Sequence, residues 1–269
     1  MTTTLAKRVT SAITLGVIVL PVIWVGGPYF LAGIMALALL ASWEYARMLA
    51  GMGYKPQYPL LAILAILLPL EAHFRSVPSL QSEILVGAVL LSLAGQVFRR
   101  NAKHPLIDWA LSLAGALYIS LPLAFAILLR NLTGGVYWVF LLLLIVWTCD
   151  SCAYLAGTTF GRHGFFTHIS PKKTIEGALG GIIAGSVVAF AGVPFLPISL
   201  AQALPLGLAV ALAATFGDLA ESLIKRQLKA KDSGNTIPGH GGFLDRIDSV
   251  VLSVIVMYSY AAWIARFPW

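Results

Sequence analysis

The residues best suited to chemistry lie in one charged stretch near the C-terminus, from Glu221 to Asp248. Ionisable side chains are crowded there, in a chain that is 59% hydrophobic and only 11% charged. A membrane-embedded chain keeps such groups where they are paired, hydrated or bound to a ligand. Glycines and a proline interrupt the stretch, which indicates a tight loop whose backbone can come close to a ligand.

The composition places this loop in a polytopic helical membrane protein. The 269 residues have a mean hydropathy of +0.87 and a formal net charge of +7. Apolar runs of about 20 residues, the length that crosses a bilayer, recur along the chain. The fold class is therefore all-α, an integral membrane protein with about nine transmembrane helices. We expect them near residues 9–26, 28–50, 58–74, 80–98, 106–129, 135–157, 174–195, 199–224 and 246–265.

The basic residues predict a cytoplasmic N-terminus. With that orientation most of the 18 lysines and arginines lie in cytoplasmic segments, and the opposite side keeps Arg75, Arg130 and Arg266. This distribution follows the positive-inside rule. We expect residues 1–130 to form a scaffold of about five helices. Residues 131–269 should form the catalytic region, with an active site that faces the cytoplasm.

Carboxylates from three distant helices meet at one membrane face in this topology. Asp150 lies near the cytoplasmic end of its helix, and Asp218 and Glu221 lie near the end of theirs. Asp245 and Asp248 mark the start of the last helix. Together with the lysine-rich loops on that face, they suit a divalent metal and a phosphorylated substrate. A helix end that reaches water explains some of these charges, but Asp218 follows an unbroken apolar run.

A second cluster of basic residues follows the helix that carries Asp150. Ser170 and Pro171 are typical of a helix N-terminus, so we expect the next helix to begin there, with Lys172 and Lys173 in its first turn. Cations at that position oppose the helix dipole, and a triphosphate bound at the helix start would resolve the conflict. The alternative is a pair of ordinary membrane anchors on the positive side.

Glycines divide into a binding group and a packing group. Gly241 and Gly242 lie next to His240 and suit contacts between backbone N–H groups and phosphate, although a lone loop histidine more often has no ligand. Three glycines at four-residue spacing predict a packing stripe on one helix: Gly177, Gly181 and Gly185. Gly217 should let a neighbouring helix or a ligand approach beside Asp218.

The N-terminal scaffold contains few polar residues at membrane depth. Its acidic exceptions there are Glu44, Glu71 and Asp108. We expect this half to serve as scaffold, lipid-facing surface or dimer interface.

These residues resemble a known family. The run S-L-I-K-R-x-x-K-x-K-D-S-G-x-x-x-P-G-H-G-G-F-L-D-R-I-D at Ser222–Asp248 resembles the signature of one enzyme family. That family is phosphatidate cytidylyltransferase, also called CDP-diacylglycerol synthase. Its second conserved region resembles D-x-x-A-Y (Asp150–Tyr154), F-G-R (Phe160–Arg162) and I-S-P-K-K-T-x-E-G (Ile169–Gly177). The match covers about the last 120 residues. One departure is Ser151-Cys152, where the bacterial family usually has Thr-Gly, and it leaves Asp150 and Tyr154 intact.

The resemblance implies a reaction of CTP with phosphatidic acid that gives CDP-diacylglycerol and pyrophosphate. It also implies Mg²⁺, a membrane homodimer and the bacterial cytoplasmic (inner) membrane. We expect no nucleic-acid partner. The implied metal ligands are Asp218, Asp245 and Asp248. The implied catalytic residues are Asp218, Asp245, Lys225 and Arg246. The implied substrate-binding residues are Asp150, Ser170, Lys172, Lys173, Thr174, Glu221, Arg226, His240, Gly241 and Gly242.

Rival functions make different use of the same charges. A CTP-dependent lipid kinase of the dolichol kinase type is distantly similar and would move the γ-phosphate to a lipid alcohol. A transporter would hold its charges near the midplane between inverted repeats, whereas these carboxylates cluster at one face and no such repeat is visible. A non-catalytic scaffold would not need the charged stretch.

Overall fold

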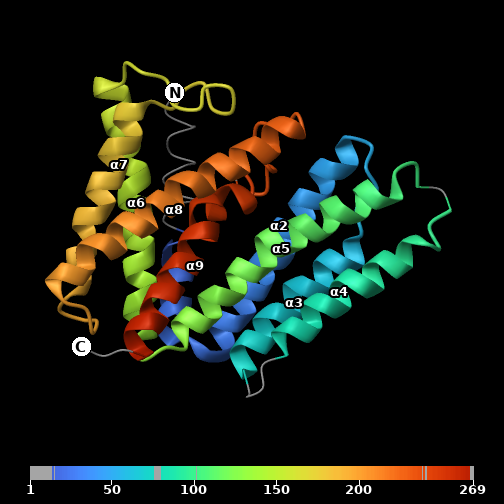
Figure 1. Ribbon diagram of the computed structural model, residues 1–269, viewed down its shortest axis with the longest axis horizontal. Coiled ribbons are helices and arrows are strands. Elements are labelled where there is room, and N and C mark those ends of the chain that lie inside the picture. The colour runs from blue at the N-terminus through green and yellow to red at the C-terminus, as the bar shows by residue number, and fades with distance from the viewer. Residues whose placement is uncertain are drawn as a thin grey trace. The chain divides into compact units, whose positions relative to one another are not determined.

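The computed structural model describes residue 14 and residues 16–75, 80–100, 102–237, 239 and 241–266. Those residues fold into helices joined by short loops (Figure 1). The helices are α2 (Gly27–Gly51), α3 (Tyr58–Phe74), α4 (Gln81–Gln96), α5 (Pro105–Arg130), α6 (Gly135–Phe160), α7 (Ile175–Val188), the 3₁₀-helix η1 (Ala189–Gly192), α8 (Leu200–Gln227) and α9 (Leu244–Arg266). A further apolar helical segment, Gly16–Val25, precedes α2.

Six helical segments in the described part are long and apolar enough to cross a membrane. They are Gly27–Gly51, Pro105–Arg130, Gly135–Phe160, Ile175–Gly192, Leu200–Gln227 and Leu244–Ile264. Their number confirms the all-α, polytopic membrane class, since each provides the length that the hydrocarbon layer requires. The apolar helices Gly16–Val25 and Tyr58–Phe74 are shorter. The count of nine spans therefore stays a prediction.

The described residues divide into two compact units. The first contains the helices up to Ile127 together with Gln227–Arg246, and the second contains Leu128–Arg226 and the residues from Ile247 onward. The charged stretch singled out by the sequence is thus shared between them. Its loop belongs with the N-terminal helices, whereas a division at residue 130 assigns the loop to the C-terminal region.

Two polar side chains of the first unit make hydrogen bonds to segments that are distant in the sequence. The hydroxyl of Tyr45 on α2 donates a hydrogen bond to the carbonyl of Leu111 on α5 (3.0 Å). Gly115 makes room for this ring, because a Cβ there would lie 2.0 Å from Tyr45 Cε1. The buried Asp108 accepts a hydrogen bond from the backbone N–H of Lys55 (2.9 Å). Tyr45 and Asp108 therefore join the parts of the scaffold to one another.

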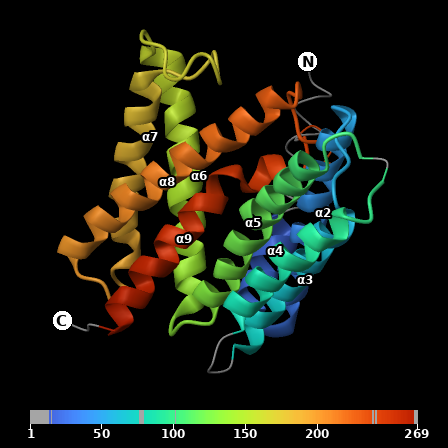
Figure 2. The same cartoon turned by 45° about the vertical axis from the view of Figure 1, so that its right-hand side comes forward.

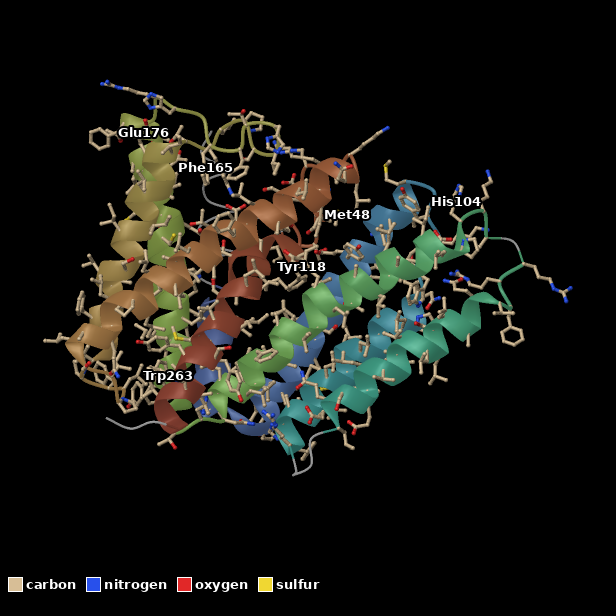
Figure 3. All side chains as sticks on the ribbon, in the orientation of Figure 1. Met48, His104, Tyr118, Phe165, Glu176 and Trp263 are labelled. Atoms are coloured by element: carbon tan, nitrogen blue, oxygen red, sulfur yellow. The ribbon has the colours of Figure 1, made fainter. Side chains whose placement is uncertain are left out.

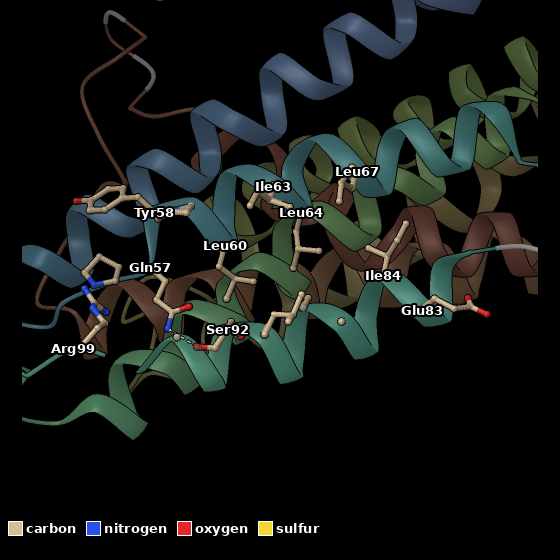
Figure 4. A pocket seen from close by; sticks show the side chains of 16 residues that line it. Gln57, Tyr58, Leu60, Ile63, Leu64, Leu67, Glu83, Ile84, Ser92 and Arg99 are labelled. Carbon is tan, nitrogen blue, oxygen red and sulfur yellow. Dashed lines mark hydrogen bonds between the residues drawn. The ribbon is translucent and has the colours of Figure 1, made fainter. Parts of the chain in front are cut away.

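A groove of about 660 Å³ runs between α3 and α4 in the first unit (Figure 4). Its lining is mainly apolar, as at Leu60, Leu64 and Ile84. At one point Gln57 Nε2 donates a hydrogen bond to the carbonyl of Ser92 (3.1 Å). Among the residues that the structure describes, none of those predicted to bind substrate or metal lines it.

The helices α6 and α7 of the second unit lie side by side in both ribbon views (Figures 1 and 2). Glycines make this approach possible: a Cβ on Gly181 would lie 2.6 Å from the carbonyl oxygen of Cys149. A Cβ on Gly177 would lie 2.8 Å from the carbonyl oxygen of Ala153, and one on Gly185 would lie 3.0 Å from Ala211 Cβ. The predicted packing stripe is confirmed, and its partners are α6 and α8.

Candidate active site

Carboxylates from three helices lie within electrostatic range of one another in the second unit. The carboxylate of Asp248 on α9 lies close enough to those of Asp218 on α8 and Asp150 on α6 for their negative charges to repel one another. Ser249, the residue after Asp248, donates from its hydroxyl to Asp150 Oδ1 (3.4 Å). The predicted convergence of these three aspartates is thus present.

Gly217 brings α8 and α9 together beside these aspartates. A Cβ on Gly217 would lie 2.5 Å from the carbonyl oxygen of Asp248. The neighbour that this glycine admits is therefore the backbone of α9. Asp248 lies at this contact, and Asp218 directly follows Gly217. The close approach therefore brings the two aspartates near each other.

Lys173 forms an ion pair with Asp218, with 2.6 Å between Nζ and Oδ2. The ammonium nitrogen is buried, although a quarter of the side chain is exposed (25%). The other oxygen of Asp218, Oδ1, accepts a hydrogen bond from the hydroxyl of Ser222 (3.4 Å). A residue predicted to hold phosphate is thus joined to a residue predicted to hold metal.

A second ion pair joins Glu221 and Lys225 one helical turn apart on α8. The Glu221 side chain is fully buried (0% exposed). Lys225 also interacts electrostatically with Asp248. Because an isolated buried carboxylate is costly, this lysine compensates Glu221 and extends the charged cluster toward the end of α8.

The helix after this cluster begins later than the sequence predicts. Its first residue is Ile175, and the N-cap is Thr174, whose hydroxyl accepts a hydrogen bond from the backbone N–H of Gly177 (3.1 Å). The predicted start at Ser170 is wrong because Ser170 makes a turn instead, where its carbonyl accepts from Lys173 N (3.2 Å). Lys172 therefore precedes the helix and does not oppose its dipole from within the first turn.

The loop between α6 and α7 is held by hydrogen bonds at its start and in its middle. Glu176, labelled in Figure 3, accepts from the backbone N–H groups of Arg162 (3.1 Å) and His163 (3.2 Å). The ring of His163 lies 2.6 Å from the other oxygen of Glu176. In the middle of the loop, Arg226 Nε of α8 donates to the carbonyl of Ile169 (3.2 Å). Arg226, predicted to bind substrate, here holds the loop that carries Lys173.

The remaining predicted residues belong to the first unit. Asp245 is 8% exposed, and its Oδ2 accepts hydrogen bonds from Ser233 N (2.9 Å), Ser233 Oγ (3.0 Å) and Gly242 N (2.8 Å). The N–H of Gly242, predicted to contact phosphate, thus donates to a carboxylate in the first turn of α9. Arg246 is exposed. His240 lies outside the described residues.

Sequence reasoning missed two carboxylates that organise these loops. Glu176 follows the predicted lysine pair, and Glu44 was assigned to the scaffold. Glu44 accepts hydrogen bonds from the backbone N–H groups of Phe243 and Leu244 (both 3.0 Å). The available signal was its position, since a carboxylate inside an apolar helix needs donors.

The aspartate cluster of the second unit fits Mg²⁺ in its chemistry. Mg²⁺ is held by oxygen ligands, commonly one or two carboxylates completed by substrate phosphates and water. Asp218 and Asp248 supply such oxygens. Within the described part of the chain, no group of three or more His, Cys, Asp or Glu side chains forms a ligand set by itself. Phosphate oxygens would therefore have to complete the coordination.

Known proteins match this chain along almost its whole length. The profile of the cytidylyltransferase family matches residues 6–264. The chain belongs to the cytidylyltransferase family. Phosphatidate cytidylyltransferase of Bacillus subtilis (strain 168) is 33% identical over 258 residues, which cover 94% of this chain and 96% of that protein. The enzymes of the same name from Staphylococcus saprophyticus and Staphylococcus aureus (strain COL) are each 32% identical, over 90% of this chain and 93% of theirs.

Membership of the cytidylyltransferase family extends the resemblance beyond the C-terminal signature. The signature and the second conserved region together cover about the last 120 residues, whereas the family profile begins at residue 6. The match to the family therefore includes the N-terminal helices as well. Glu44 on α2 lies within the matched range.

Proposed function

We propose that this chain transfers the cytidylyl group of CTP to phosphatidic acid, giving CDP-diacylglycerol and pyrophosphate. The observation that carries the proposal is the match to phosphatidate cytidylyltransferases over nine-tenths of the chain. The cluster formed by Lys173, Asp218 and Asp248 supports it, because phosphate chemistry needs both cations and metal-binding carboxylates.

The reaction places modest demands on acid–base chemistry. A phosphate oxygen of phosphatidic acid attacks the α-phosphorus of CTP, and the bond to the bridging oxygen of the pyrophosphate breaks. The nucleophile is already an anion, so the side chains need not remove a proton. Their work is to position the two substrates and to neutralise charge.

Lys173 and Lys172 are assigned to the CTP phosphates. Lys173 is already held beside the aspartates by its ion pair with Asp218, and Lys172 is exposed on the same turn. When a phosphate takes up the charge of Lys173, the carboxylate of Asp218 is released to bind metal. The pair thus couples nucleotide binding to assembly of the metal site.

Asp218 and Asp248 would hold Mg²⁺, and Asp150 lies within range to support them. The ion, when bound, neutralises phosphate charge and orients the phosphoryl group for in-line attack. The role of Asp245 as a ligand stays a prediction, which the Asp245→Asn variant tests. Lys225, Arg226 and Arg246 are assigned to the phosphatidate headgroup or to the departing pyrophosphate.

The proposal also includes a membrane topology. Nine spans with a cytoplasmic N-terminus would put the aspartate cluster on the cytoplasmic face of the bacterial cytoplasmic membrane, where CTP is available. The distribution of basic residues supports this orientation. Acyl chains would enter from the bilayer between helices, and the enzyme would act as a homodimer.

The test uses purified protein in detergent, phosphatidic acid, Mg²⁺ and CTP carrying label on either the α- or the γ-phosphorus. Cytidylyl transfer predicts that the α-label enters the lipid phase and that the γ-label leaves as pyrophosphate. A lipid kinase would give the opposite distribution when supplied with a lipid alcohol. Transfer of the γ-label to lipid, or no transfer of either label, would refute the proposal.

A further inference from the structure

The signature loop closes on a carboxylate from the N-terminal half of the chain. Glu44 on α2 is 2% exposed. Its Oε1 accepts hydrogen bonds from Thr236 Oγ1 (2.7 Å) and Phe243 N (3.0 Å). Its Oε2 accepts from Ser233 Oγ (2.9 Å) and Leu244 N (3.0 Å). Four donors from the loop before α9 and from its first residue thus surround one side chain that lies about 190 positions earlier in the sequence.

Two of these donors belong to the start of α9. Leu244 is the first residue of that helix, and Phe243 precedes it. The first N–H groups of a helix have no partner within the helix and carry partial positive charge. Glu44 therefore caps α9 from another helix, which fixes where α9 begins.

Ser233 connects Glu44 to Asp245. Its hydroxyl oxygen lies 2.9 Å from Glu44 Oε2 and 3.0 Å from Asp245 Oδ2. A hydroxyl has one hydrogen to donate, so the two carboxylates share it. A displacement of Glu44 therefore changes the hydrogen bonding of Asp245 directly.

Glycines show how tightly the loop encloses the two carboxylates. A Cβ on Gly242 would lie 2.2 Å from both Glu44 Oε2 and Ser233 Oγ. A Cβ on Gly234 would lie 3.0 Å from Glu44 Oε1. Gly241 adopts φ 79°, and a Cβ there would lie 2.5 Å from Asp245 Oδ2. At Gly234, Gly241 and Gly242 an added Cβ would therefore meet a protein carboxylate.

We infer that Glu44 is a positioning residue for cytidylyl transfer. It holds Ser233, Thr236 and the start of α9 in one arrangement, and thereby sets the positions of Asp245 and Arg246. The kinetic part of this inference rests on the proposed function. The part that concerns loop conformation does not.

The test replaces Glu44 by glutamine, which keeps the size of the side chain. One of its two acceptor oxygens becomes an NH₂ group, which cannot accept from backbone N–H groups. We expect kcat to fall about 10- to 100-fold, the effect typical of losing a supporting partner of an active-site residue, while KM for CTP changes little. Amide hydrogen exchange in residues 241–246 should accelerate, whereas exchange in α6 should not.

Glu83→Gln is the matched control, since it makes the same chemical change at an exposed position on α4. It should leave kcat and exchange unchanged. Glu44→Asp restores the carboxylate on a shorter stem and should recover part of the activity. If Glu44 has a purely structural role, Glu44→Gln and Glu44→Asp should lower the folded fraction equally. The kcat per folded molecule should then stay normal, and that result would overturn the inference.

Further outcomes separate the claims. Faster exchange in Glu44→Gln with normal kcat would overturn the positioning role, as would normal exchange with normal kcat. If Glu44→Gln does not fold, Thr236→Val removes one donor instead, and the same two readouts decide. Wild-type protein that fails to transfer label would refute the proposed function alone, because the exchange experiment needs no substrate.

Discussion

Lys173 Nζ lies 2.6 Å from Asp218 Oδ2, joining the loop before α7 to the end of α8. The lysine is predicted to hold nucleotide phosphate and the aspartate to hold metal. Phosphate binding needs the positive charge of Lys173, and metal binding needs the negative charge of Asp218. Because the ion pair neutralises both charges, we expect the binding of phosphate and of metal to be coupled. Arg226 supports this arrangement, because its Nε donates to the carbonyl of Ile169 in the loop that carries Lys173 (3.2 Å).

Lys173→Ala should weaken CTP binding more than Lys172→Ala does. Lys173 is held beside the aspartates, whereas Lys172 is exposed and its charge is more strongly screened. Loss of a hydrogen bond to a charged group costs about 1.5–3 kcal/mol, so KM for CTP should rise roughly 10- to 100-fold. Steady-state kinetics at saturating phosphatidic acid would measure both variants. Equal effects of the two substitutions would contradict the special position of Lys173.

The pair should also behave as coupled in a double-mutant cycle. Because each residue is the partner of the other, Lys173→Ala combined with Asp218→Asn should lose less activity than the product of the two single losses. The measurement is kcat/KM for CTP in the wild type, both single variants and the double variant. Strictly multiplicative effects would show that the ion pair has no part in turnover.

Gly217→Ala should destabilise the protein and reduce its activity. The added methyl group would lie 2.5 Å from the carbonyl oxygen of Asp248, and overpacking of this kind costs about 1–3 kcal/mol. Gly87→Ala on α4 is the matched control, because a Cβ there meets nothing within 4 Å. Thermal unfolding in detergent should show a lower midpoint for Gly217→Ala only. Similar midpoints for both variants would argue against the close contact of α8 with α9.

Thr174→Ala tests the corrected start of α7. Loss of the bond from Gly177 N to the Thr174 hydroxyl removes an N-cap, which costs about 1 kcal/mol. The unfolding midpoint should fall by about 2–4 °C, whereas Thr174→Ser should keep most of the stability. If Ser170→Ala lowers the midpoint and Thr174→Ala does not, the helix begins where the sequence alone predicts.

The sequence predicted those features that depend on composition and local spacing. The apolar segments gave the helical membrane class, and the spacing of Gly177, Gly181 and Gly185 gave the α7 packing stripe. Gly217 was expected to admit a close neighbour, and the backbone of α9 is that neighbour. A convergence of carboxylates from three helices was expected, and Asp150, Asp218 and Asp248 do lie near one another. Their placement at the cytoplasmic face stays a prediction.

Features that depend on distant or competing partners were not predictable. Ser170-Pro171 and Thr174 are both acceptable helix starts, and local rules do not choose between them. The donors around Glu44 lie about 190 residues away, so nothing near Glu44 identifies them. The sequence linked Gly241 and Gly242 to phosphate, because a single sequence does not show that Glu44 and Asp245 lie against these glycines.

The most direct measurement of the central claim is transfer of α-labelled cytidylyl to phosphatidic acid by purified wild-type, Asp218→Asn and Glu83→Gln proteins. The account predicts that the wild type and Glu83→Gln transfer label, that EDTA stops transfer and that added Mg²⁺ restores it. Asp218→Asn should fold normally but lose activity by at least about 100-fold, since metal-based charge stabilisation contributes several kcal/mol. Near-normal transfer by folded Asp218→Asn would contradict the assignment of the active site to this cluster.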